Sequence, residues 1–219
     1  IAKKARWIKD PGAGKPTALN IAFKQARGRI LIFTDGDVYI GENALNLLIA
    51  RCEEADVGIV SGRPRSLNPR DTFFGYISHL LTDVGAHESR IRLDMEKKFL
   101  VCSGYLYALR KGLVTEIPKE ALADDTVVSY LVYKKGYRTV YEPRAEVYVR
   151  YPTNFKDWIA QKRRSTRGNI ELKKFFGGRN EMRSFTKESR GIFSVFTYPQ
   201  SLREILWTIL LVVLRFYLW

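Results

Sequence analysis

The chain has 219 residues, of which 46% are hydrophobic and 13% aromatic, so it is long enough for one sizeable domain with its own core. This composition excludes a disordered chain, and two scattered cysteines, Cys52 and Cys102, exclude a disulfide framework and argue against a zinc site. A formal net charge of +14 requires a partner that tolerates it, such as nucleic acid, anionic lipid or an acidic substrate.

The spacing of apolar residues predicts alternating strands and helices in the first third of the chain. In chain order we expect a strand over 6–9, a turn over 11–14, a helix over 17–27, a strand over 29–33, a helix over 45–52 and a strand over 57–61. Such alternation is typical of an α/β fold with a mostly parallel sheet flanked by helices.

The later elements are less regular. We expect a helix over 73–81, a strand that enters a helix within 100–109, a helix over 126–135 and two strands over 137–141 and 147–151. Gly136 follows the predicted helix over 126–135, where a left-handed cap is favoured.

Two carboxylates, Asp35 and Asp37, directly follow the apolar strand over 29–33. The end of a buried strand faces the crevice in which open α/β sheets bind ligands. Carboxylates suit Mg²⁺ or Mn²⁺, which keep part of their coordination shell for water and substrate phosphates. Because aspartates are also common in turns, the pair alone is a weak signal for a metal site and a phosphorylated substrate.

A second acidic pair, Asp124 and Asp125, precedes the predicted helix over 126–135. Helix capping explains one aspartate, because a carboxylate at an N-terminus complements the helix dipole. It does not explain two, since each carboxylate disfavours ionisation of the other. A positioned, ionised carboxylate is what a general base needs to take a proton from a hydroxyl.

The glycine-rich segment 12–17 resembles the end of a P-loop, but Lys9 stands where that pattern needs Gly and Pro16 where it needs Ser or Thr. A Walker A motif is therefore excluded. Glycines before Lys15 at a helix start still offer backbone donors and charge to a phosphate.

The basic charge is concentrated late in the chain. Residues 161–190 contain ten Lys or Arg and three Glu, so this segment carries +7 of the net +14. Residues 205–219 are apolar but too few for a full span of about 20 residues. A basic stretch followed by a Trp-bearing apolar one predicts the cytoplasmic flank of a membrane protein, and a buried C-terminal helix is the alternative.

A helix expected over 154–165 carries Phe155, Trp158 and Ile159 on one face. We expect this face on the bilayer surface, with packing against the core as an equal alternative. The chain then divides into a catalytic core over 1–152, a basic amphipathic interfacial segment over 153–195 and the start of a membrane-associated helix over 196–219.

Five motifs occur in a fixed order from about residue 9 to 165: GKPTALN at 14–20, ILIFTDGD at 30–37, CSGY at 102–105, ADD at 123–125 and QKRR at 161–164. In this order they resemble the family 2 glycosyltransferases. The resemblance implies a GT-A fold, with Mg²⁺ or Mn²⁺, that transfers a sugar from a nucleotide diphosphate sugar to an acceptor hydroxyl with inversion. It also implies further strands and a base-binding loop before Ile1, so we expect an N-terminally truncated core.

The resemblance also implies roles for particular residues. They are the metal ligands Asp35 and Asp37, the catalytic base Asp125, the donor and diphosphate residues Lys15, Asn20, Asp35, Gln161 and Arg164, and the acceptor-side residues Ser103, Gly104, Asp124 and Asp125. Ser165 replaces the Trp of the QxxRW motif of polysaccharide synthases, so that match is partial.

Several alternatives stay open. The acceptor can be a glycan or a lipid-linked acceptor, or alternatively a polyprenyl phosphate. We expect the enzyme at a membrane surface with anionic lipid, with the catalytic domain on the cytoplasmic face. A non-catalytic membrane-associated protein is a second class. A nucleic-acid binder that uses the basic segment with Phe175, Phe176 and Phe185 is a third, which we disfavour because it leaves the acidic residues unexplained.

Overall fold

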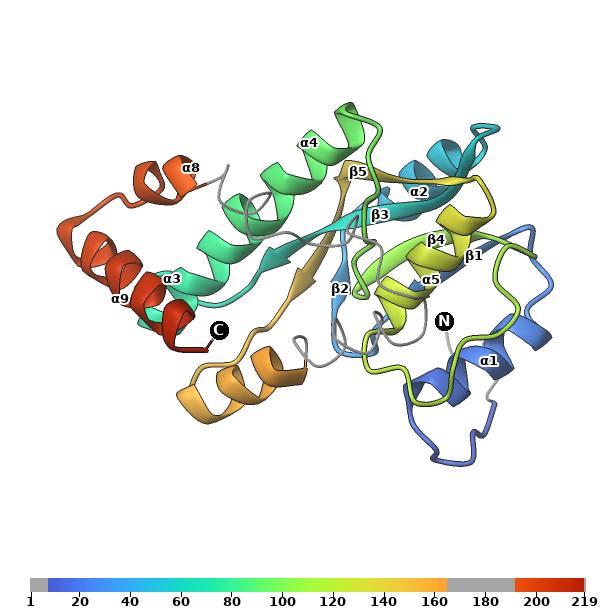
Figure 1. The fold of residues 1–219 in the computed structure, drawn as a ribbon, viewed down its shortest axis with the longest axis horizontal. Coiled ribbons are helices and arrows are strands. Elements are labelled where there is room, and N and C mark those ends of the chain that lie inside the picture. The colour runs from blue at the N-terminus through green and yellow to red at the C-terminus, as the bar shows by residue number, and fades with distance from the viewer. Residues whose placement is uncertain (1–7, 165–191, 219) are drawn as a thin grey trace.

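A computed structural model describes residues 8–164 and 192–218 as a five-stranded sheet with helices on both faces (Figure 1). Its elements are α1 (Lys15–Gln25), β1 (Ile30–Thr34), β2 (Tyr39–Ile40), α2 (Ala44–Cys52), β3 (Val57–Ser66), α3 (Phe73–Leu80), the π-helix η2 (Leu81–Glu88), α4 (Ser89–Met95), β4 (Leu106–Arg110), α5 (Asp124–Lys134), β5 (Arg138–Val149), α8 (Ile192–Thr197) and α9 (Leu202–Leu218). A further helix covers residues 155–164.

The strand order is β1-β4-β3-β5-β2. The α/β class is as expected, but a mostly parallel sheet is wrong for the described residues, because only β3 and β5 pair in parallel. Strands β1, β3 and β5 do run in one direction, as the alternation predicted. The long segment over 67–105 then brings β4 between β1 and β3 in the opposite direction, and local periodicity does not reveal which strands become neighbours.

Most local expectations are confirmed. Helices appear at α1, α2, α3 and α5, and Gly136 after α5 has a left-handed φ of 81°. The two strands expected over 137–141 and 147–151 are instead one strand, β5, whose pairing with β3 shifts register between Ser61 and Arg63. The strand expected within 100–109 begins only at Leu106 and enters no helix. Of the strand expected over 6–9, residues 6 and 7 lie outside the described residues, and residues 8 and 9 form no strand.

Two buried clusters hold the helices on opposite faces of the sheet (Figure 1). On one face, α1 and α5 contribute Phe23, Val128 and Val132. On the other face, α2 contributes Leu48, which is fully buried. Gly58 of β3 permits the close approach of α5, since an added Cβ would lie 2.5 Å from Val132 Cγ1. This packing fixes the start of α5 relative to the strand ends.

A third cluster joins α3, the helix over 155–164 and α9. Trp158 is buried against this cluster and Leu211 of α9 lies in it, so core packing is the correct alternative for Trp158. Phe155 stays 44% exposed, although its ring stacks on Phe73 with the centroids 6.1 Å apart. The expectation that the whole stripe faces a bilayer is therefore wrong for Trp158.

The C-terminal helix α9 docks along one side only. It buries Glu204, Thr208 and Leu211, while its other side exposes a run of apolar residues: Leu202, Ile205, Leu206, Ile209, Leu210 and Val213. Within residues 8–164 and 192–218 there is no helix long and apolar enough to cross a membrane. Most of the basic segment expected over 153–195 lies outside the described residues.

Candidate active site

Lys15 connects two acidic motifs that are far apart in the sequence. Its Nζ lies 2.9 Å from Asp35 Oδ1, just beyond β1, and 3.3 Å from Asp124 Oδ2, at the start of α5. Burial lowers the pKa of Lys15, but Asp124 and Asp35 outweigh that effect and raise it, so the ammonium stays charged. One lysine therefore brings three of the predicted motifs into a single site.

The local sequence places Lys15 at the first turn of α1. Gly14, at the N-cap, has a φ of 93°, which glycine adopts without strain. Pro16 follows near the start of the helix, where its fixed φ favours helix initiation and its missing N–H costs nothing.

Asn20 does not join this site. Its side-chain Nδ2 donates to Ile117 O over 2.9 Å, and its Oδ1 accepts from Ile117 N over 2.8 Å. The buried amide thus holds α1 to the loop before α5, and both of its polar ends are used. The structure thus shows a structural role for Asn20, and its expected donor-binding role stays a prediction.

Asp125, at the start of α5, is half-buried, and its Oδ1 accepts a hydrogen bond from Thr126 N over 2.8 Å. Burial raises the pKa of Asp125, and the neighbouring Asp124 raises it further. A Cβ added to Gly104 would lie 3.5 Å from Asp125 Oδ2. The backbone of the expected acceptor-side loop therefore lies directly against the candidate base.

The rest of that loop is buried. Ser103 is 3% exposed, and its backbone N–H donates to Ser61 Oγ over 2.9 Å. The preceding Cys102 N–H donates to Ser129 Oγ over 3.0 Å. The Ser103 backbone is therefore held by β3, and its expected acceptor-side role stays a prediction. Ser61 carried no motif signal, whereas Ser129 could have been found, because it lies one helical turn after Asp125.

Tyr105 contacts the end of β1 and feels the charge of Arg164. Thr34 Oγ1 donates to Tyr105 O over 3.0 Å. Burial raises the pKa of the Tyr105 phenol, the charges of Asp35 and Asp37 raise it further, and Arg164 lowers it. Arg164, exposed on the helix over 155–164, is thus close enough to act on the same edge of the sheet, and Gln161 is half-buried one turn earlier. Sequence reasoning missed Tyr105, which had no signal beyond following Gly104.

The donor set fits a divalent metal shared with a ligand. Asp35 and Asp37 are oxygen donors, and Asp35 keeps 30% of its side chain exposed. The described part of the chain contains no group of three or more His, Cys, Asp or Glu side chains that would enclose an ion. Mg²⁺ or Mn²⁺ would need waters and phosphate oxygens to complete its shell. Among the described residues, the buried Tyr107 OH lacks a hydrogen-bond partner, and Asp124 Oδ2 has only the Lys15 ion pair at 3.3 Å.

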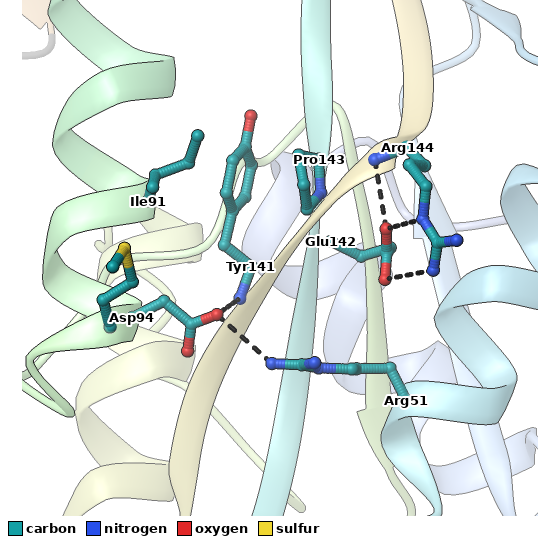
Figure 2. A pocket seen from close by; sticks show the side chains of 8 residues that line it. Arg51, Ile91, Asp94, Tyr141, Glu142, Pro143 and Arg144 are labelled. Carbon is teal, nitrogen blue, oxygen red and sulfur yellow. Dashed lines mark hydrogen bonds and ion pairs between the residues drawn. The ribbon is translucent and has the colours of Figure 1, made fainter.

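A separate cavity of about 330 Å³ lies between α2, α4 and β5, and Figure 2 shows its lining. Its charges are paired internally: Asp94 accepts from Arg51 and from Tyr141 N, and Glu142 accepts from Arg144. No residue of the candidate site lines it. Arg51 Nε also pairs with Glu54 Oε1 at 3.3 Å, so the charged groups of this cavity are compensated within the fold.

A sequence model of the family described as "Glycosyltransferase like family 2" matches residues 4–168, about three quarters of the chain. The chain therefore belongs to this family, as its ordered motifs predicted. It is 26% identical over 162 residues to a probable glycosyltransferase of Bacillus subtilis, YdaM, which covers 72% of this chain and 39% of that protein.

The chain is also 26% identical over 174 residues to the poly-β-1,6-N-acetyl-D-glucosamine synthase of Staphylococcus aureus, covering 74% of this chain and 41% of that protein. It thus spans about two fifths of the length of these curated relatives. Among solved structures, the mannosyltransferase from Pyrobaculum calidifontis in complex with GDP-Man and Mn²⁺ superposes with a TM-score of 0.56 at 19% identity, covering 94% of this chain and 60% of that one. This likeness confirms the GT-A type of fold.

Proposed function

We propose that the chain is the catalytic part of a metal-dependent enzyme that transfers a sugar, with inversion, from a nucleotide diphosphate sugar to the hydroxyl of a glycan or lipid-linked acceptor. The observation that carries this proposal is the position of Lys15, which contacts Asp35 of the metal motif and Asp124 beside the base. The diphosphate-binding end of the site therefore adjoins its acceptor end.

Asp125 acts as the base in this mechanism. Its carboxylate takes the proton of the acceptor hydroxyl while that oxygen attacks the anomeric carbon from the face opposite the diphosphate. The new C–O bond forms as the bond to the leaving phosphate oxygen breaks, and the nucleoside diphosphate departs. A single base suffices, because the diphosphate is a good leaving group.

The cations of the site bind the diphosphate. Asp35 and Asp37 would hold Mg²⁺ or Mn²⁺, which supplies Lewis-acid neutralisation of the leaving group when bound. Lys15 adds a point charge beside Asp35, and Arg164 offers a planar pair of donors suited to phosphate oxygens. Phosphate oxygens would accept the same kind of charge-assisted contact from Lys15 that Asp35 and Asp124 accept here.

The test is release of nucleoside diphosphate from UDP-N-acetylglucosamine, GDP-mannose and other nucleotide sugars, with Mn²⁺, Mg²⁺ or EDTA. We expect the unaltered chain to release nucleoside diphosphate from one of these donors. This release should be lost when EDTA is added, and it should also be lost in the Asp37→Ala and Asp125→Asn variants. Asp56→Asn is the matched control, because Asp56 is exposed and paired with Arg138 away from the site. No release from any donor by the full-length protein, or equal release with EDTA, would contradict the proposal.

We further propose that the enzyme works at an anionic membrane surface, with its catalytic site on the cytoplasmic side. The exposed apolar side of α9 supports this, because Leu206 is 67% and Val213 59% exposed. Arg203 lies over the Trp207 ring at 4.4 Å, a pairing suited to a headgroup interface.

Flotation with phosphatidylglycerol vesicles and with neutral phosphatidylcholine vesicles tests the membrane proposal. We expect binding that Leu206→Glu removes and that salt weakens. Leu45→Glu on α2 is the control, since Leu45 is 40% exposed but lies on another part of the molecule. Equal flotation of the Leu206→Glu and unaltered chains would exclude α9 as the contact surface.

A further inference from the structure

We infer that two buried serines, Ser129 and Ser61, are positioning residues that fix the acceptor-side loop against the Asp125 carboxylate. This inference rests on the proposed function, in which Asp125 is the base. The two hydroxyls lie on different elements, α5 and β3, and both are completely buried. Neither serine belongs to a motif of the sequence.

Ser129 bridges the base residue and the loop with one hydroxyl. Its Oγ donates to Asp125 O over 2.8 Å and accepts the backbone N–H of Cys102 over 3.0 Å. Because a hydroxyl is both a donor and an acceptor, it satisfies both partners at once. The start of the loop is therefore tied to the backbone of the catalytic residue.

Ser61 provides a second attachment from the middle of the sheet. Its Oγ accepts the backbone N–H of Ser103 over 2.9 Å and donates to Gly62 O over 3.2 Å. β3 pairs on both sides, with β4 and with β5, so Ser61 stands on a rigid element. Ser61 therefore fixes the loop relative to the sheet, as Ser129 fixes it relative to α5.

A third hydroxyl completes the set. Thr34 Oγ1, at the end of β1, donates to Tyr105 O over 3.0 Å. Attachments at Cys102, Ser103 and Tyr105 therefore surround Gly104, whose missing Cβ would lie 3.5 Å from Asp125 Oδ2. The backbone against the carboxylate is therefore held from α5, β3 and β1 together.

Buried N–H groups need partners in any fold, so the serines also contribute to stability. A positioning role makes a narrower prediction, since a loop that moves by about 1 Å can cost roughly 100-fold in rate. Replacing either serine should lower kcat rather than raise the KM for the nucleotide sugar. Lys15 and Asp35, which we propose to bind the nucleotide sugar, contact neither serine. A merely structural role lowers stability and leaves the kinetics of the folded enzyme unchanged.

The experiment compares Ser129→Ala and Ser61→Ala in the full chain, using the nucleotide sugar from which release is observed and a membrane extract as the source of acceptor. We expect kcat to fall roughly 10- to 100-fold with the donor KM unchanged. Without extract, release to water should fall less than transfer, because water needs no guidance by the loop. Ser129→Thr, which keeps the hydroxyl, should restore most of the lost kcat.

Ser78→Ala is the matched control, because Ser78 is also buried and its Oγ donates to Gly75 O over 2.7 Å, but on α3. It should lower thermal stability without changing kcat. If Ser129→Ala does not fold, Ser61→Ala decides the question from another element. Wild-type kcat in both folded alanine variants overturns the inference, as does a rise in donor KM at constant kcat. An active Asp125→Asn would instead overturn the proposed function.

Discussion

Two polar regions of this chain differ in how completely their charged side chains are paired. The candidate site has four carboxylates (Asp35, Asp37, Asp124 and Asp125), and Lys15 forms ion pairs with two of them, Asp35 and Asp124. Beneath α9, Arg70 donates to both oxygens of Glu204, over 2.8 and 3.0 Å, and Gln200 N donates to Glu204 as well. The first region is left with excess negative charge, and the second is neutral and complete.

The pKa shifts follow the same division. Hydrogen bonding from Arg70 lowers the pKa of Glu204, whereas burial and Asp124 raise the pKa of Asp125. A lowered carboxyl pKa stabilises the folded state, and a raised one destabilises it at neutral pH. Destabilised charge in a half-buried position is typical of functional sites, and compensated charge of structural ones. The opposite pKa shifts therefore favour a functional role for the cluster around Asp125 and a structural role for the Arg70–Glu204 pair.

The largest expected effect is that of Asp125→Asn. Removing the base should lower kcat roughly 10²- to 10⁴-fold, while metal-dependent donor binding persists. Stability should be equal or higher, because one of two adjacent buried carboxylates is neutralised. Turnover assays and thermal unfolding on the same preparation measure both. A marked loss of stability in Asp125→Asn would mean that Asp125 has a structural role, as Glu204 does, and would contradict the proposed difference between the two regions.

Glu204→Gln tests the other region. Losing the charged hydrogen bonds from Arg70 should lower the free energy of unfolding by about 1–3 kcal/mol, nearer the lower value because Arg70 is 30% exposed. Since the pKa of Glu204 is lowered, this stabilisation is present at neutral pH and lost as the pH falls through that lowered pKa. Turnover by the folded enzyme should not change.

Chemical denaturation at pH 7 and at pH 3 measures this difference. Asp56→Asn, which breaks the exposed pair with Arg138, should have a smaller effect on stability. Equal stability of the Glu204→Gln and unaltered chains at pH 7 would mean that apolar packing alone docks α9.

The sequence predicted the parts of the fold that depend on local spacing. Helices α1, α2, α3 and α5 follow from apolar residues three and four apart, and β1 from an apolar run. The neighbours of β4 did not follow, because strand pairing is decided by contacts across the whole chain. The Arg70–Glu204 pair, separated by 134 positions, has no local signature either.

The candidate site shows the same limit. Its acidic residues and Lys15 were predicted from the order of motifs, but the bonds of the Asn20 amide to Ile117, 97 positions away, were not. Ser61 was missed, since its role is to accept one backbone N–H from a distant loop. A motif identifies groups that touch substrate, whereas the residues that hold them are visible only in three dimensions.

Lys15→Met should have an intermediate effect. Loss of one charge-assisted contact to phosphate should raise the donor KM roughly tenfold, with a smaller change in kcat. Stability should change little, because the Lys15 side chain is 48% exposed and its ion pairs are screened. Lys24→Met, in the last turn of α1, is the control. An unchanged donor KM would show that Lys15 only compensates carboxylates, as Arg70 does for Glu204.

The smallest effect is a shift in pH dependence. The value of kcat/KM should rise with pH as Asp125 ionises, which gives the pH profile an acidic limb. Because the pKa of Asp125 is raised, this limb should lie above the ordinary aspartate value of about 3.9. Burial is the first cause, Asp124 adds to it, and Thr126 N, Arg90 and Lys15 oppose it. Asp124→Asn removes the repulsion, so the limb should move to lower pH, whereas exposed Glu116→Gln should leave it in place. A limb that stays or moves to higher pH in Asp124→Asn would mean that Asp124 acts only by holding Lys15, and the site would then resemble the compensated region under α9.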